Sequence, residues 1–95
     1  MPEMRFLIRW PDGRAESCYS PSLVVKDYLV PGETYPLPDF IERSRAMLNI
    51  ASERVRAKYG FACSSAMDQL ARIETAAAAF AHLPEARVTV DGFEE

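Results

Sequence analysis

The sequence predicts an α+β fold in which a three-stranded sheet, antiparallel or mixed, packs against a long helical hairpin. Three observations lead to this fold class: an alternating apolar run with a turn sequence near the N-terminus, two helical stripes of apolar residues in the middle, and a β-branched run near the C-terminus. The expected order is strand, strand, short helix, long helix, long helix, strand. With 95 residues, the chain is expected to form a single domain, 1–95.

An N-terminal hairpin is predicted first. Alternation along residues 5–10 places three large apolar side chains on one face, those of Phe6, Ile8 and Trp10. The sequence Pro11-Asp12-Gly13 is typical of a turn. Residues 14–19 then return as the second strand, where alternation places Cys18 on the same face as Glu16.

The next segment allows two interpretations. Ser20 followed by Pro21 is typical of an N-cap and a first helical position, which predicts a short helix over residues 23–29. Because two adjacent valines in this stretch favour strands, a continued extended chain is the alternative. Residues 30–38 hold three prolines and a glycine and are predicted to form a loop.

The helical hairpin is predicted from two apolar stripes. Pro38 can open the first helix, and Gly60 can close it as a left-handed cap. Its stripe is broken only by Ser44 and repeats at steps of three and four residues: Phe40, Ser44, Met47, Leu48, Ala51, Val55 and Tyr59. The second helix is expected to have Ser65 as its N-cap and to end at Pro84. Its stripe consists of Ala66, Leu70, Ile73, Ala77 and Phe80.

The last strand is predicted over residues 87–90, and Asp91 with Gly92 is expected to close the ordered chain. A strand of this length is not stable alone. We therefore expect it to join the N-terminal hairpin in one sheet.

Composition limits the classes of function. A net charge of −3 argues against non-specific binding to nucleic acid or anionic membranes. No apolar run approaches the roughly 20 residues of a membrane span. The N-terminus leads directly into the first strand without a signal or transit sequence, so a cytoplasmic protein with reduced cysteines is expected. Two cysteines and one histidine are too few for a four-ligand zinc site without carboxylates, so no metal or other cofactor is expected.

Both cysteines lie just ahead of predicted helix starts, where the helix dipole favours a thiolate. With their neighbours they define a candidate thiol or small-molecule site: Cys18, Tyr19, Ser20, Cys63, Ser64 and Ser65. The alternative for Cys63 is a packed apolar residue at a helix junction. The alternative for Ser20 is that it only caps its own backbone. His82 lies at the far end of the second helix and cannot serve as a base for Cys63.

A candidate partner surface lies in the proline-rich loop, at Tyr28, Tyr35 and Leu37. Such a loop either packs over the sheet or offers the aromatic side chains that dominate protein interfaces. Basic residues of the first long helix suggest nucleic acid, but the second helix carries Asp68, Glu74 and a run of alanines that cannot read bases. A protein partner is therefore expected, and a nucleic-acid partner is not.

Several stretches of the sequence are similar to a known family: Arg9-Trp10-Pro11-Asp12-Gly13, Cys18-Tyr19-Ser20-Pro21-Ser22, Pro31-Gly32-Glu33-Thr34-Tyr35-Pro36, residues 51–60 and Phe61-Ala62-Cys63-Ser64. They resemble the small bacterial nitrogen-starvation-response family. The resemblance implies a gene cluster that also encodes a nitrilase and a radical-SAM protein, and hence a pathway for nitriles, cyanide or a related nitrogen source. It implies no catalytic residues, because none are established for that family.

The leading hypothesis is a small non-enzymatic accessory protein that binds a protein partner encoded in such a cluster, with self-association as a variant. The exposed sheet edge and the proline-rich loop are its expected surfaces. The alternative is a thiol-dependent carrier or small-molecule binder that uses Cys63. A nucleic-acid-binding regulator is the third hypothesis.

Overall fold

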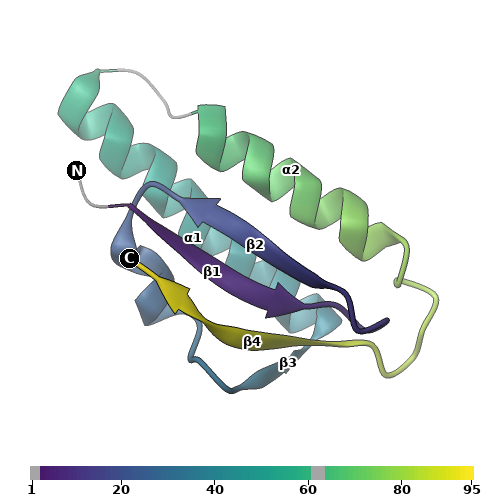
Figure 1. Ribbon diagram of the computed structural model, residues 1–95. Helices are drawn as coiled ribbons and strands as arrows, with labels where there is room; N and C mark the ends of the chain where they lie inside the picture. Colours follow the sequence, from purple (N-terminus) through teal and green to yellow (C-terminus); the bar gives the residue numbers. More distant parts are fainter. Residues whose placement is uncertain (1–2, 61–63) are drawn as a thin grey trace.

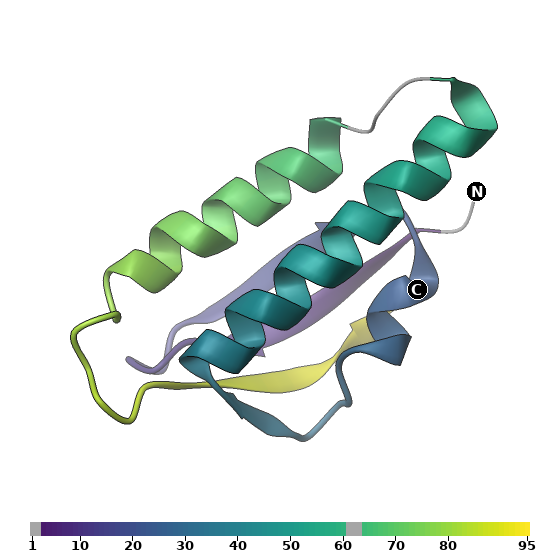
Figure 2. The same ribbon diagram turned by 180° about the vertical axis from the view of Figure 1, so that it is seen from behind.

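The computed structural model describes residues 3–60 and 64–95, and within them both long helices cover one face of a four-stranded antiparallel sheet (Figures 1 and 2). The order of strands across the sheet is β2-β1-β4-β3. The predicted α+β class and the helical hairpin on one sheet face are confirmed. The sheet has one strand more than the three that the sequence predicted.

The predicted N-terminal hairpin is confirmed. Strand β1 (Met4–Arg9) pairs with β2 (Ala15–Ser20) in antiparallel register. The turn between them closes where Trp10 N donates to Arg14 O at 2.8 Å, and Gly13 has a φ of 91°. Glycine suits this left-handed position because it lacks a Cβ atom.

The segment after β2 forms a short 3-10 helix, η1 (Leu23–Asp27), so the helical interpretation of this stretch is the correct one. The predicted N-cap at Ser20 is wrong: Ser20 is the last residue of β2, where it pairs with Met4. The cap is Ser22, whose Oγ accepts a hydrogen bond from Val24 N at 3.3 Å. Val24 and Val25 are both buried, so they contribute to the core from η1.

The predicted loop over residues 30–38 contains the additional strand, β3 (Thr34–Pro36). It pairs with β4 at the edge of the sheet, with Thr34 opposite Thr89 and Tyr35 opposite Val88. Proline fits at the end of an edge strand because it has no N–H to donate to a neighbour. The proline content of this stretch therefore obscured a real strand.

Helix α1 (Leu37–Tyr59) begins one residue before Pro38 and ends as predicted at Gly60, whose φ is 83° and whose N–H donates to Arg56 O at 2.8 Å. Its predicted apolar stripe is buried except for Tyr59, which is 49% exposed. Tyr59 is the last residue of the helix, where the chain turns away. Ser44 belongs to the buried stripe, as its spacing predicted.

Helix α2 (Ser64–Ala78) includes Ser65 within its first turn, so the N-cap predicted at Ser65 is wrong. The helix also ends before Pro84, because the chain tightens into turns in which Phe80 N donates to Ala77 O at 2.9 Å. These turns direct Phe80 into the core, where its ring stacks on Trp10 with centroids 5.9 Å apart. The predicted stripe of α2 is buried throughout, Phe80 included.

Strand β4 (Arg87–Glu94) continues beyond Val90, where the sequence predicted its end. It passes Asp91 and Gly92 because a bulge there lets the strand remain paired with β1, with Val90 opposite Ile8 and Gly92 opposite Leu7. None of the helices in residues 3–60 and 64–95 is long and apolar enough to cross a membrane.

Candidate functional site

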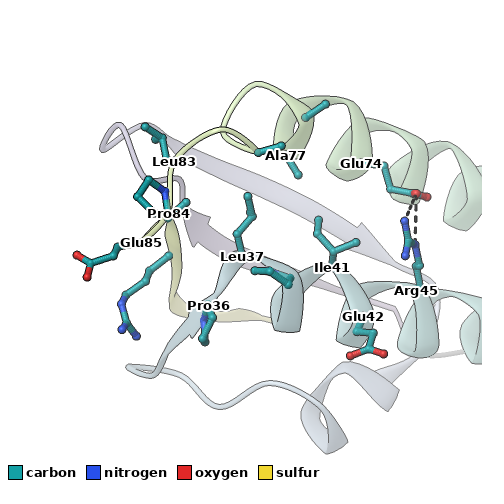
Figure 3. Close-up of a pocket in the computed structure, with 15 residues that line it drawn as sticks. Pro36, Leu37, Ile41, Glu42, Arg45, Glu74, Ala77, Leu83, Pro84 and Glu85 are labelled. Carbon is teal, nitrogen blue, oxygen red and sulfur yellow. Dashed lines mark hydrogen bonds and ion pairs between the residues drawn. The ribbon is translucent and has the colours of Figure 1, made fainter.

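An apolar groove of about 870 Å³ lies between the two long helices and the chain that leads into β4 (Figure 3). It is bounded by the N-terminal half of α1, the C-terminal end of α2 and residues 81–87. Its lining residues are Pro36, Leu37, Pro38, Ile41, Glu42, Arg45, Glu74, Ala77, Ala78, Ala81, Leu83, Pro84, Glu85, Ala86 and Arg87. A groove of this size lies in the range of known ligand-binding pockets.

Helical spacing produces the apolar floor of this groove. Leu37, Ile41 and Arg45 follow one another at steps of four and therefore share one face of α1. Ala77 faces them from α2, and Figure 3 shows Leu37 and Ile41 pointing toward it. Ala77 contributes only a methyl group to the lining opposite Leu37 and Ile41.

The two ends of the groove differ in chemistry. At one end the Arg45 guanidinium donates to Glu74 Oε2 from Nη2 at 3.0 Å and from Nε at 3.3 Å, which joins α1 to α2 (Figure 3). At the other end lies Leu83, an apolar side chain that is 42% exposed. Three glutamates and two arginines line the groove, so its charge is slightly negative.

A second hollow, the polar notch, lies where α2 meets the outer edge of the sheet. Its volume is about 350 Å³, and it is lined by Arg5, Ser17, Tyr19, Ser65, Asp68, Gln69 and Arg72. Gln69 Oε1 accepts a hydrogen bond from Tyr19 N at 3.0 Å, on the side of β2 that has no neighbouring strand. The guanidinium of Arg5 lies over the Tyr19 ring, 5.9 Å from its centroid.

The candidate thiol site is divided between the core and this notch. Tyr19 and Ser65 both line the notch, so the structure brings them together. Cys18 is fully buried, and burial, together with the nearby Glu16 carboxylate, raises the pKa of its thiol far above the ordinary value. The Cys18 Sγ lies 3.9 Å from Glu16 Oε2. A buried thiol that holds its proton is not a nucleophile at neutral pH.

The serines of the candidate thiol site also separate. Ser20 is fully buried, and its hydroxyl donates to Ser22 O at 2.7 Å, so it serves the local backbone. Ser64 is exposed at the first residue of α2. Cys63 lies outside the described residues. The described members of the predicted site therefore do not form one cluster.

The candidate partner surface is largely packed. Tyr35 and Leu37 are 9% and 7% exposed, and Tyr28 is half-buried. Tyr35 lies under the Arg43 guanidinium, 4.8 Å from its ring centroid, and its hydroxyl accepts from Val30 N at 2.9 Å. Of the three residues, Leu37 lines the apolar groove.

Most residues of the groove were missed by sequence reasoning. Ala77 was assigned to the apolar stripe of the second helix, the alanine run was interpreted as unable to read bases, and Pro84 was interpreted only as the helix end. A signal was present in Leu37, Ile41 and Arg45, whose spacing gives α1 a second, partly apolar face beside its buried stripe. The described residues contain no group of three or more His, Cys, Asp or Glu side chains that could hold a metal ion.

Comparison with known proteins gives one finding. The family model described as nitrogen starvation-induced protein NitG matches residues 5–93, nearly the whole chain. Neither the curated proteins nor the solved structures gave a match. The match covers both long helices and all four strands of the sheet apart from its outermost residues. The chain therefore belongs to the NitG family of nitrogen starvation-induced proteins.

Proposed function

We propose that this protein is a non-enzymatic accessory protein of the nitrogen-starvation response, and that it binds an apolar segment of a partner protein in the apolar groove. The observation that carries the proposal is the groove itself, because a concave surface with several apolar side chains in its lining is typical of a binding site. Leu83 supports the same view, because a leucine that is 42% exposed at the rim gives a partner an apolar contact.

The charges of the groove suggest the chemistry of the partner. Glu42 and Glu85 line it without an ion-pair partner among residues 3–60 and 64–95, whereas Arg45 is already paired with Glu74. The slight excess of acidic side chains favours a segment whose apolar residues are flanked by lysine or arginine. Arg87 also has no ion-pair partner within residues 3–60 and 64–95. An acidic residue at one end of the partner segment would form an ion pair with it.

We propose that the protein acts in the cytoplasm. Its partner is proposed to be among the products of the same gene cluster, which the family resemblance implies. The alternative of a thiol carrier receives no support from Cys18, because that thiol is buried and protonated. The proposal rests instead on a surface built from apolar side chains.

Two exposed apolar residues in loops provide a matched pair of variants. Leu83 lines the groove, whereas Val30 is 53% exposed and lies outside it. Tagged wild-type protein, Leu83→Asp and Val30→Asp are each used to capture proteins from nitrogen-starved cells, with quantification by mass spectrometry. Thermal melting of each variant serves as the check of folding, and because both side chains are exposed, only small changes are expected.

A protein that is retained by wild type and by Val30→Asp, but lost with Leu83→Asp, is the expected result. A protein retained equally by both variants, or no retained protein at all, contradicts the proposal. Capture of an untagged copy of the same chain that depends on Leu83 would also contradict it, because the groove would then hold a second copy.

Charge provides an independent test on the purified pair. Replacing Glu42 and Glu85 with glutamine is expected to weaken partner binding severalfold at low ionic strength, because the complementary charges are lost. The difference from wild type should shrink as salt is added. Binding that is tighter after the replacement would show that the partner is acidic, against the proposal.

A further inference from the structure

We propose that the polar notch binds a small molecule that carries both a carboxylate and an amino group. The notch is distinct from the apolar groove, with which it shares no lining residue. Its lining contains charged groups of both signs that have no ion-pair partner among the described residues, and these surround a buried amide. This inference is independent of the partner proposed for the groove.

Gln69 supplies the first observation. Its side chain is only 7% exposed, and its Oε1 is committed to Tyr19 N at 3.0 Å. Its Nε2 has no exposed surface and no hydrogen-bond partner among the described residues, so a ligand reaches it when side chains that line the notch move aside. Because Tyr19 N needs an acceptor, the amide cannot be turned to exchange its oxygen and nitrogen. A buried amide that keeps two N–H groups unpaired is unfavourable, and a bound acceptor would satisfy it.

The surroundings of Gln69 favour an anionic acceptor. Arg5 and Arg72 line the same notch and have no ion-pair partner within residues 3–60 and 64–95. Both are exposed and long, so they can turn toward a bound group on a fast timescale. Ser65 adds a hydroxyl from the first turn of α2, where the helix dipole favours negative charge. A carboxylate suits these donors, because arginine binds it through two parallel N–H groups.

Asp68 supplies the second part of the ligand. Within the described ranges 3–60 and 64–95 it is the one carboxylate that lines the notch, and it has no ion-pair partner there. Arg72 lies four residues further along α2, yet the two side chains form no ion pair. Because the Asp68 carboxylate has no ion-pair partner among the described residues, it can bind the amino group of a ligand. A zwitterion such as an amino acid presents both charges at once.

The test is a nuclear magnetic resonance titration of the full-length ¹⁵N-labelled protein with each of the common amino acids. The side-chain NH₂ signals of Gln69 report directly on the proposed contact. At least one amino acid is expected to bind with a Kd of about 1 mM or tighter. Its analogues without the amino group, and with the carboxylate converted to an amide, are expected to bind about tenfold more weakly.

Three variants test which residue of the notch binds which group of the amino acid. Arg72→Gln is expected to weaken binding of the amino acid about tenfold. Asp68→Asn is expected to make the amino acid and its deaminated analogue bind equally. Arg56→Gln, on α1 and in the lining of neither the notch nor the groove, is the control and should leave binding unchanged. All three residues are exposed, so the fold should persist.

Three results would overturn the inference. The first is the absence of any shift of the Gln69 side-chain signals with every amino acid. The second is binding that Arg72→Gln leaves unchanged. The third is a deaminated analogue that binds wild-type protein as well as its parent amino acid, which would remove the role of Asp68.

Discussion

The N-terminal half of α2 lies against the sheet edge and lines the polar notch, whereas its C-terminal end faces α1 and lines the apolar groove. In the first region, the helix meets an edge strand whose backbone N–H groups need acceptors, and Gln69 provides one. In the second region, the helix meets side chains of another helix, and alanines leave space beside Leu37 and Ile41. The residues of each half of α2 therefore match the element against which that half packs, β2 or α1.

The largest expected effect comes from a substitution at the buried position of α2 that lies between the two regions. Ile73 is fully buried and lies on α2 between Gln69 and Ala77. We expect Ile73→Ala to lower the free energy of unfolding by about 2–5 kcal/mol, because it removes buried methyl groups and leaves a cavity. Urea denaturation measures the loss. A change below about 1 kcal/mol would show that α2 is not held by this contact.

The next effect concerns Cys18, a core residue that adjoins the polar notch. Cys18 lies on β2 next to the notch residue Tyr19 but faces the opposite side of the sheet. Since burial raises the pKa of this thiol, the folded protein keeps a proton that the unfolded chain loses above about pH 9. Stability should therefore fall as pH rises through that range.

The expected slope from Cys18 is up to about 1.4 kcal/mol per pH unit above about pH 9. The measurement is the difference in unfolding free energy between wild type and Cys18→Ala, from pH 7 to pH 11, since other groups titrate in both proteins. A difference that stays constant with pH would contradict the burial of this thiol.

A smaller effect tests the acceptor that Gln69 gives to the sheet edge. In Gln69→Leu, Tyr19 N loses the acceptor that α2 provides, so its amide hydrogen should exchange with solvent about tenfold faster. The amide of Phe6, in the centre of the sheet, should be unaffected and serves as the control. Equal protection of the Tyr19 amide in both proteins would remove the link between α2 and β2.

The smallest effect concerns the end of the groove. Arg45 and Glu74 are 56% and 40% exposed, so water and salt screen their attraction. A double-mutant cycle with Arg45→Ala and Glu74→Ala is expected to give a coupling of about 0.2–1 kcal/mol that decreases with salt. A coupling that does not respond to salt would indicate that the two side chains are shielded from solvent.

The hairpin and both helices were predictable because their signals are local. Pro11-Asp12-Gly13 marks one turn, and the stripes of α1 and α2 mark the faces that pack on the sheet. Strand β3 was not predictable, since it depends on a partner far along the chain: Thr34 and Thr89 are 55 residues apart. Its local prolines favoured a loop.

Both candidate regions depend on similarly distant pairs. Arg45 and Glu74 are 29 residues apart, and Tyr19 and Gln69 are 50 residues apart. The sequence placed Tyr19 and Ser65 in one candidate site by virtue of their hydroxyls, but it could not show that Cys18 faces the core. Strand alternation predicted that Cys18 and Tyr19 lie on opposite faces of the sheet. Which of these two faces the helices cover depends on how the sheet packs.

The most direct test of the account is a scan of photo-crosslinking residues along α2 and the turn that follows it, carried out in nitrogen-starved cells. The positions are Ala78 and Ala81 in the groove, Ser65 in the notch, and Ala71, which is exposed and lines neither. If a partner segment occupies the groove, Ala78 and Ala81 alone give a protein adduct. Equal adducts from Ser65 or Ala71, or none from Ala81 in a folded protein, would contradict it.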